Sequence, residues 1–176
     1  MRNRDIVYIA LFAAIAIVLG LIPAIPISFI PVPITARSLS LMLAGSILGA
    51  RRGGLAMLLF LVLIAIGIPQ ASGGSGLGVF LGPRGGFLLA FPIAAYVIGW
   101  LMERSRDRFN VGMALAANLI GGIAVVYAIG IPWLAIGTGW ETALAAVVFI
   151  PGDVVKAVIA ALAAVAVQRA YPQIQR

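Results

Sequence analysis

Apolar segments alternate with short polar, glycine-rich or proline-rich connections along the whole chain. Six such segments can be delimited, and the longer ones are long enough to cross a bilayer as helices. They lie near Ile6–Ile22, Ser38–Ala50, Gly53–Ile68, Gly86–Met102, Val111–Ile131 and Ala143–Val167. The second and third are short and joined only through Arg51 and Arg52, which predicts a tight helical hairpin. The pattern predicts one domain over residues 1–176, an all-α integral membrane protein with a bundle of six transmembrane helices.

The composition agrees with a membrane protein. Hydrophobic residues make up 63% of the 176 residues and charged residues only 10%, with a mean hydropathy of +1.16. Soluble domains are about half apolar and about one quarter charged, so this chain falls outside the soluble class. A multi-pass position in the lipid bilayer of the cell membrane is therefore expected.

The basic residues give the orientation of the bundle. Of the 12 Lys and Arg residues, one group falls on a single side of the predicted spans, namely Arg2, Arg4, Arg51, Arg52, Arg104, Arg106, Arg108, Arg169 and Arg176. Arg37 and Arg84 fall on the other side, and Lys156 lies within a span. Basic loops stay in the cytoplasm, so both termini are predicted to be cytoplasmic. The net charge of +7 then reflects topology, and no nucleic-acid partner is expected.

Several kinds of chemistry are excluded by what the sequence lacks. It has no cysteine, no histidine and only five acidic residues, which argues against disulfides, a metal centre and a histidine base. No Gly-Lys-Ser/Thr phosphate-binding loop is present, so the chain is not expected to hydrolyse ATP itself. An intramembrane enzyme would need several acids or histidines facing one site, and the five acids are scattered. We therefore expect a protein that is not an enzyme.

Asp153 and Lys156 are the most informative residues, because they place two charges inside the last apolar segment. Residues three apart share a helix face, so the two side chains are predicted to point the same way. One interpretation is a neutral ion pair that only fixes this helix against its neighbours. The favoured interpretation is a substrate site, since charges at membrane depth are costly and a buried pair is a poor source of stability.

The connection from Pro23 to Arg37 combines four prolines with many apolar side chains. Proline at this density excludes a regular helix and favours an extended path. Apolar, non-helical backbone at membrane depth must be shielded by protein. The segment could be a plain linker, but its apolar content favours a lid over the helices, with Phe29 pointing inward.

Three further side chains are candidates for a binding site. Arg84 lies near the end of the glycine-rich stretch Pro69–Gly85 on the outer side, where it either reaches lipid headgroups or meets a ligand carboxylate. Asn118 lies inside an apolar run and needs a partner on a neighbouring helix or on a ligand. Tyr96 lies deeper in its span than an interfacial aromatic does, which leaves a role in a pocket open.

The first apolar segment carries small residues at helical spacing, including Ala10 and Ala14. Small residues four apart let two helices approach closely. Such a face serves either ordinary packing within the bundle or docking of another membrane subunit. The pattern alone leaves both alternatives open.

Taken together, these segments resemble the BioY-type biotin-binding S components of energy-coupling factor (ECF) vitamin transporters. The resemblance covers nearly the whole chain and rests on Val32-Pro33-Ile34-Thr35, Leu43-Ala44-Gly45 with Leu48-Gly49, Gly73-Gly74-Ser75-Gly76-Leu77-Gly78, Leu81-Gly82-Pro83-Arg84-Gly85-Gly86-Phe87, and Pro151-Gly152-Asp153 with Lys156. Each motif is weak alone, but their combination and order are specific.

The resemblance implies a six-helix bundle with an outward-facing vitamin pocket under the first outer loop, in a bacterial or archaeal membrane. It implies a capture subunit for biotin that carries no cofactor of its own. Its expected partners are a transmembrane coupling subunit and two cytoplasmic ATPase subunits that use the ATP. Ala10 and Ala14 are similar to the small-residue motif by which such proteins dock on the coupling subunit.

The candidate residues suit the chemistry of biotin. Its ureido ring offers two N–H donors and a carbonyl, so Asp153 can accept from the ring while Asn118 or Lys156 donates to it. The lid and Tyr96 can supply apolar walls. Arg84, Arg37 or a hydroxyl can hold the carboxylate. The alternative is a proton-coupled secondary transporter of biotin or another small vitamin with Asp153 as proton carrier, but no inverted repeat is visible.

Overall fold

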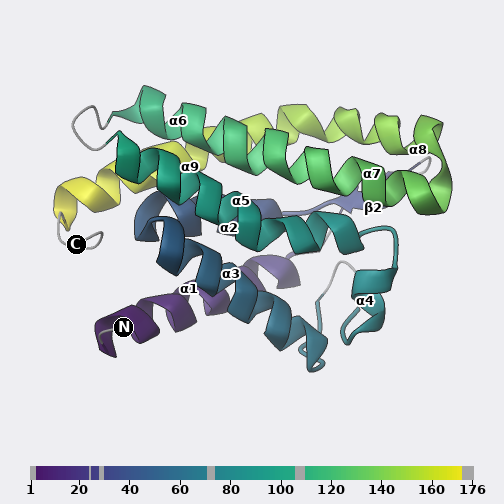
Figure 1. Cartoon of the computed structure of the whole chain (residues 1–176), viewed down its shortest axis with the longest axis horizontal. Coiled ribbons are helices and arrows are strands. Elements are labelled where there is room, and N and C mark those ends of the chain that lie inside the picture. The colour runs from purple at the N-terminus through teal and green to yellow at the C-terminus, as the bar shows by residue number, and fades with distance from the viewer. Residues whose placement is uncertain (1–2, 24, 28–29, 71–73, 106–109, 172–176) are drawn as a thin grey trace.

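The computed structural model describes residues 3–23, 25–27, 30–70, 74–105 and 110–171, and for 25–27 and 30–34 it describes the backbone. The elements in chain order are α1 (Asn3–Leu21), β1 (Ile25–Ile27), β2 (Ile30–Ile34), α2 (Arg37–Leu48), α3 (Ala50–Ala65), α4 (Gly78–Leu81), α5 (Gly85–Arg104), α6 (Val111–Leu119), the π-helical segment η2 (Ile120–Val125), α7 (Val126–Thr138), α8 (Trp140–Leu144), the 3-10 segment η3 (Ala145–Phe149) and α9 (Ile150–Ala170). Figure 1 shows their arrangement as a bundle of helices.

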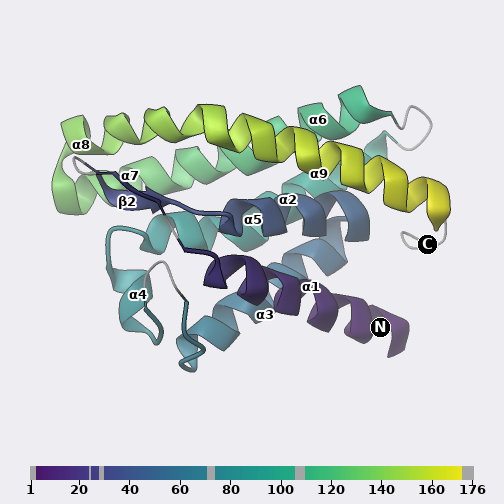
Figure 2. The same ribbon diagram turned by 180° about the vertical axis from the view of Figure 1, so that it is seen from behind.

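Four helical segments of the described part are long and apolar enough to cross a membrane. Two of them are α1 and α5, and the others are compound rods: α6, η2 and α7 run on over Val111–Thr138, and α8, η3 and α9 run on over Trp140–Ala170. The two rods run along the length of the molecule in both views (Figures 1 and 2). The prediction of a helical membrane protein is therefore confirmed.

Two predicted boundaries need correction. The connection between the predicted spans Val111–Ile131 and Ala143–Val167, from Pro132 to Thr142, was expected to be a loop. Instead, α7 continues through Pro132 to Thr138. Proline is tolerated here because neighbouring helices in a membrane bundle compensate for the missing backbone hydrogen bond. The last helical rod also begins earlier than expected, at Trp140, because only Gly139, with φ of +84°, separates it from α7.

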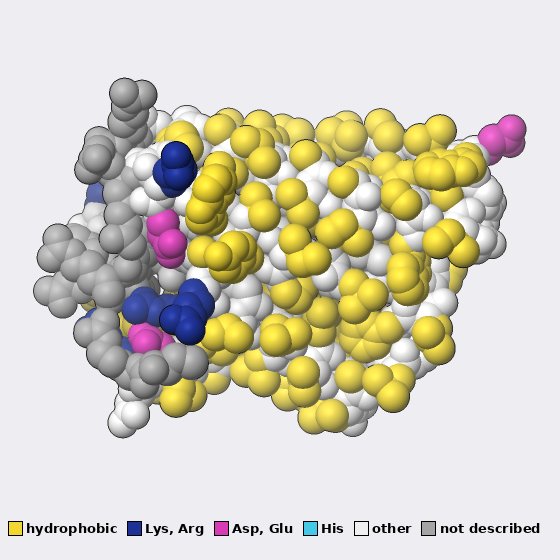
Figure 3. All heavy atoms as spheres, in the orientation of Figure 1, with side chains coloured by type: hydrophobic (Ala, Val, Ile, Leu, Met, Phe, Trp, Pro, Cys, Tyr) yellow, Lys and Arg dark blue, Asp and Glu magenta, His cyan; other side chains and the backbone are white. Residues whose placement is uncertain are grey.

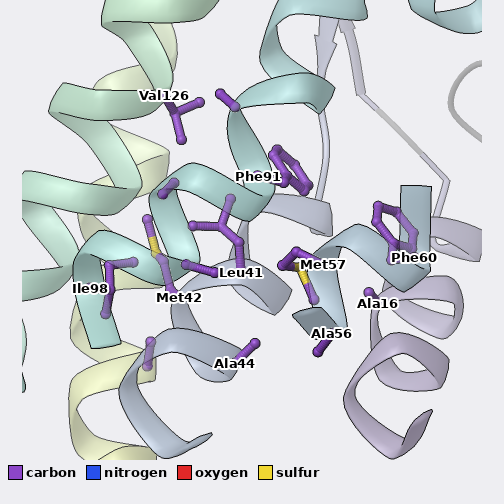
Figure 4. Close-up of a cluster of buried hydrophobic side chains, with 14 of the residues drawn as sticks. Ala16, Leu41, Met42, Ala44, Ala56, Met57, Phe60, Phe91, Ile98 and Val126 are labelled. Atoms are coloured by element: carbon purple, nitrogen blue, oxygen red, sulfur yellow. The ribbon is translucent and has the colours of Figure 1, made fainter. Parts of the chain in front are cut away.

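The short helix α2 lies at the centre of the bundle. It packs against α1, α3, α5 and α9, and most of its residues are buried. Its 12 residues span only about 18 Å, less than the roughly 30 Å of a bilayer core. Figure 4 shows Leu41, Met42 and Ala44 of α2 among side chains from the surrounding helices. The stacked rings of Phe60 and Phe91, 6.2 Å apart, extend this core between α3 and α5.

The turn between α2 and α3 confirms the predicted hairpin but is tighter than expected. A single residue, Gly49 with φ of +86°, joins the helices, while Arg51 and Arg52 lie within α3. The backbone N–H of Ala50 donates to the carboxylate of Glu103 on α5 at 2.9 Å, which satisfies one of the open donors at the start of α3. The hairpin is thereby tied to α5.

Glu103→Ala is predicted to destabilise the chain by about 1 kcal/mol, because it removes this cap from α3. For a chain of this size, the loss corresponds to a decrease of about 2–4 °C in the unfolding midpoint. Thermal unfolding in detergent measures the shift. Glu141→Ala, at an exposed position, is the matched control, and an equal shift in both variants would contradict the role of Glu103.

Charged side chains gather at one end of the molecule. In Figure 3 most of the Lys, Arg, Asp and Glu spheres of this face cluster near the end where α1 begins and α9 ends, one acidic side chain lies at the opposite end, and the middle of the face is apolar. Arg52 of α3 and Asp5 of α1 form an ion pair of 3.1 Å, and the guanidinium of Arg104 lies 5.6 Å from the ring centre of Trp100. A charged end next to an apolar band is the pattern of a protein with one end at a membrane surface.

The proline-rich connection is extended, as predicted. Strands β1 and β2 pair antiparallel, with Ile25 opposite Ile34 and Ile27 opposite Ile30. This ribbon lies toward the end of the bundle remote from the end of α9 (Figure 2), and β2 contacts η3. The chain is therefore not wholly helical, because its prolines favour extended backbone over helix.

Candidate functional site

Asp153 and Lys156 lie in the first two turns of α9. Pro151 stands at the start of this helix, where its missing N–H costs nothing. A carboxylate in the first turn, such as Asp153, also interacts favourably with the positive end of the helix dipole. Both side chains are largely buried, with exposed fractions of 9% for Asp153 and 16% for Lys156. The predicted shared face is confirmed, since the two groups form an ion pair of 2.8 Å.

Two hydroxyl groups from other helices complete a hydrogen-bonded cluster around Asp153. Ser38 of α2 donates to Oδ1 of Asp153 at 3.0 Å, and Tyr127 of α7 donates to Oδ2 at 2.7 Å. The ammonium of Lys156 donates to Oδ1 at 2.8 Å and to the hydroxyl oxygen of Ser38 at 2.9 Å. We call these four residues, Ser38, Tyr127, Asp153 and Lys156, the Asp153 cluster. It joins α2, α7 and α9 at one point.

The Asp153 cluster forms one wall of a partly open cavity of about 80 Å³. The other lining residues are mostly apolar: Thr35, Phe87, Phe91, Gly122, Val126 and Phe149. Val126 and Phe91 also belong to the core cluster of Figure 4, which places the cavity directly beside the core. The cavity therefore combines a polar, charged wall with aromatic and aliphatic walls, as small-molecule sites do.

The packing of α5 against α7 brings the aromatic rings into the cavity. Phe87 and Phe91 are four residues apart on α5 and so share one face. The ring of Phe87 lies where a side chain at Gly130 would be, since a Cβ there would be 2.4 Å from the ring. Phe87 also meets the ring of Tyr127 edge-on at 6.0 Å. This contact fixes the orientation of both rings.

Asn118 is placed away from the cavity. It is fully buried, and its amide donates to the backbone oxygen of Ala114 at 2.9 Å and accepts from Ser46 of α2 at 3.0 Å. Of the two partners that the sequence left open, a neighbouring helix and a ligand, the structure provides the helix. Asn118 is thus a link between α6 and α2, and we no longer count it among ligand contacts.

Tyr96 does not line the described cavity. Tyr96 is 51% exposed and is not a lining residue of this cavity. It lies five and nine residues after Phe91 and Phe87, on another face of α5. Phe29 lies outside the described residues.

Arg84 lies at a second, open pocket of about 470 Å³, lined also by Gly74, Ser75, Gly78, Val79, Gly82 and Pro83. The guanidinium groups of Arg84 and Arg37 lie close enough for their charges to repel each other. Partial burial lowers the pKa of Arg84 below its ordinary value. Two cations held near each other favour an anion at this end of the molecule.

Ala10 and Ala14 both lie on an exposed face of α1, whereas Ala13 and Ala16 are buried against the bundle. Ala10 and Ala14 therefore do not serve packing within the bundle, which was one of the two alternatives for this pair. The exposed face is free to meet lipid or another membrane helix.

Sequence reasoning missed Ser38 and Tyr127. Tyr127 was not among the candidates, and Ser38 was only the first residue of a predicted span. One signal was available for Tyr127: it is a hydroxyl within an apolar segment, five residues after a Gly-Gly pair. Within the described residues, no group of three His, Cys, Asp or Glu side chains could hold a metal ion.

Comparison with known proteins gives concordant matches over almost the whole chain. A biotin transporter BioY from Rhizobium etli is 50% identical over 181 residues, covering 98% of this chain and 97% of the relative. A biotin transporter BioY from Rhodobacter capsulatus is 45% identical and covers 92% of both chains. The relatives come from bacteria and archaea.

A solved structure has the same fold. It is the crystal structure at 2.1 Å of the S-component for biotin from an ECF-type ABC transporter, with a TM-score of 0.89 and 32% identity, covering 96% of this chain and 95% of that chain. The family model that matches residues 1–173 is described as the BioY family. With its helices arranged as in that S-component and its sequence matched almost end to end, the chain is a multi-pass membrane protein of the BioY family.

Proposed function

We propose that this chain is the biotin-binding S component of an ECF-type transporter and performs no covalent chemistry. The named relatives are biotin transporters, and the similar crystal structure is an S-component for biotin. The observation that carries the proposal is the cavity with the Asp153 cluster in its wall. Charged side chains at membrane depth are costly and typically mark a substrate or ion site, so a charged pair beside a cavity supports the binding of a polar ligand group there.

The hydrogen bonds of the Asp153 cluster leave a defined capacity for a ligand. A carboxylate has about four acceptor positions, and Asp153 uses two on Oδ1 and one on Oδ2. The Lys156 ammonium has three N–H groups, and two of them reach Ser38 and Asp153. One acceptor on Asp153 and one donor on Lys156 remain. A ureido ring offers the complement, an N–H next to a carbonyl.

The net charge of this wall also fits the substrate. Asp153 and Lys156 neutralise each other, so the site suits a polar head that is itself neutral. The rings of Phe87, Phe91 and Phe149 suit the apolar bicycle and chain of biotin. We further propose that Arg84, with Arg37 beside it, receives the carboxylate at the outer end.

The charged end of the molecule is proposed to face the cytoplasm, in line with the positive-inside rule. The six predicted spans then correspond to α1, α2, α3, α5, the rod Val111–Thr138 and the rod Trp140–Ala170, with both termini cytoplasmic. ATP hydrolysis falls to two cytoplasmic ATPase subunits. The coupling subunit is proposed to dock on the exposed α1 face that carries Ala10 and Ala14.

The ribbon β1–β2 is proposed as the lid. Its second strand leads directly into Thr35, a lining residue, and contacts η3, whose last residue Phe149 also lines the cavity. We predict that Phe29→Ala speeds biotin release, because the lid seals less well. Stopped-flow or filter-binding dissociation with labelled biotin measures the rate. Equal off-rates for the variant and the wild type would remove Phe29 from the lid.

The proposed function is tested in two steps. The chain purified in detergent is expected to bind biotin at one site per molecule by calorimetric titration. Uptake of labelled biotin into proteoliposomes is then expected only when the coupling and ATPase subunits and ATP are included. Uptake by the chain alone that collapses with the proton gradient would favour the proton-coupled alternative, and absence of any binding would refute both.

A further inference from the structure

The hydroxyl of Tyr127 is the third donor to Asp153 in the Asp153 cluster, beside Ser38 and Lys156. It donates to Oδ2 of Asp153 at 2.7 Å. This is the oxygen with one acceptor position left, since Oδ1 already receives Ser38 and Lys156. We propose that Tyr127 is a positioning and specificity-determining residue, which orients Oδ2 so that it accepts one ligand N–H and no more. This inference rests on the proposed function.

The backbone around Tyr127 supports a dedicated placement. The π-helical segment η2 (Ile120–Val125) lies directly before α7. In an α-helix, residues five apart diverge by about 140°, whereas a π-turn brings residues i and i+5 close to the same side. As a result Gly122, Val126 and Tyr127 all line the cavity. Single π-turns within membrane-spanning rods are rare and are often found at functional sites.

The surroundings of Tyr127 keep its ring from moving. The residue is only 8% exposed, and its ring meets Phe87 edge-on with an interplanar angle of 90°. The space next to the π-turn at Gly122 is filled by Met42 of α2, since a Cβ at Gly122 would lie 2.4 Å from that side chain. The hydroxyl therefore approaches Asp153 along a fixed direction. A fixed donor on one lone pair of Oδ2 leaves the other at a fixed angle, as selective recognition requires.

The contact also limits what the site accepts. With Tyr127 in place, Asp153 takes one further donor and Lys156 offers one. A head with adjacent N–H and C=O groups satisfies both. A head that presents donors only, such as the cyclic guanidinium of 2-iminobiotin, leaves the Lys156 N–H facing another donor and adds a like charge. Selectivity for ureido over donor-only heads is the consequence of the full cluster.

Tyr127→Phe tests the inference in a thermodynamic cycle, in which the effect of the substitution is compared between biotin and two of its analogues. Binding is measured for biotin and for the two cyclic carbamate analogues in which one or the other ureido N–H is replaced by oxygen. For biotin, the variant is expected to bind about tenfold more weakly, since a hydrogen bond to a charged group is removed. For the carbamate that lacks the N–H facing Asp153, the substitution is expected to reduce the affinity less than about threefold. This analogue makes no hydrogen bond to Oδ2 of Asp153, so the orientation of that oxygen by Tyr127 does not affect its binding.

A packing role gives a different result. If Tyr127 only filled space, its replacement would weaken biotin and both carbamates by the same factor, and this outcome, like an unchanged affinity for biotin, would overturn the proposal. Tyr8→Phe on α1 is the matched control and is expected to leave all three affinities unchanged. Failure of the wild-type chain to bind biotin would instead refute the proposed function, and this inference with it.

Discussion

Asp153→Asn is expected to weaken biotin binding at least tenfold while leaving the fold intact. An amide of the same shape still accepts from Ser38 and Lys156 at one position. At the other position its NH₂ group faces the ligand N–H, so donor meets donor, while the hydroxyl of Tyr127 must turn from donating to accepting. Leaving such groups unpaired in a dry site costs about 1–3 kcal/mol, which is up to about two powers of ten in affinity.

Calorimetric titration of the purified variant with biotin measures this effect, and the unfolding midpoint checks the fold. Asp5→Asn is the matched control. Asp5 is also a buried acid in an ion pair, with Arg52, but it lies near the start of α1, away from the cavity. Its variant is expected to bind biotin with unchanged affinity. An unchanged affinity in Asp153→Asn would remove Asp153 from the binding site.

Lys156→Met is expected to have the largest effect on stability. It leaves the carboxylate of Asp153 buried without a counter-charge, since the side chain of Asp153 is 9% exposed. Removing one partner of a buried pair costs about 3–5 kcal/mol. The double variant Asp153→Asn/Lys156→Met removes both charges and is expected to recover most of this loss. Neither variant is expected to bind biotin at micromolar concentration.

Unfolding in mixed micelles with increasing denaturing detergent compares the three proteins. The comparison separates the two roles of the pair, because stability returns in the double variant and binding does not. If the double variant bound biotin like the wild type, the pair would serve the fold alone. If Lys156→Met were as stable as the wild type, the pair would contribute no electrostatic stabilisation.

Much of the fold could be predicted because apolar length is a direct physical requirement of the bilayer. Each of the six predicted segments coincides with a helical segment of the structure. The extended path of the connection after α1 followed from its prolines. The continuation of α7 through Pro132 could not be predicted, because the hydrogen bond lost at a proline is compensated by tertiary surroundings that the sequence does not display.

The charged half of the site could be predicted, and the hydroxyl half could not. Asp153 and Lys156 stand out since charge is expensive in an apolar run. Ser38 does not stand out, because a serine in a helix can bond its own backbone, and 115 residues separate it from Asp153. Tyr127 reaches the cluster only through the π-turn of η2, a change of register that residue spacing does not reveal.

The same limit applies to the surroundings of the other polar candidates. Asn118 and Tyr96 were both reasonable because polar groups in membrane helices need partners. Which partner each meets depends on helix rotation, and a rotation of one residue, about 100°, separates a cavity wall from the lipid face. Asn118 accepts a hydrogen bond from Ser46, and Tyr96 lies on an exposed face of α5. Phe87 and Phe91 line the cavity.

A crystal structure of the chain with bound biotin is the most direct test of the central claim. The account predicts the ureido ring in the cavity beside the Asp153 cluster, with one N–H within about 3 Å of Asp153 Oδ2 and the carbonyl oxygen at the same distance from the Lys156 ammonium. Biotin bound with its ureido ring elsewhere, and the Asp153–Lys156 pair untouched, would contradict it.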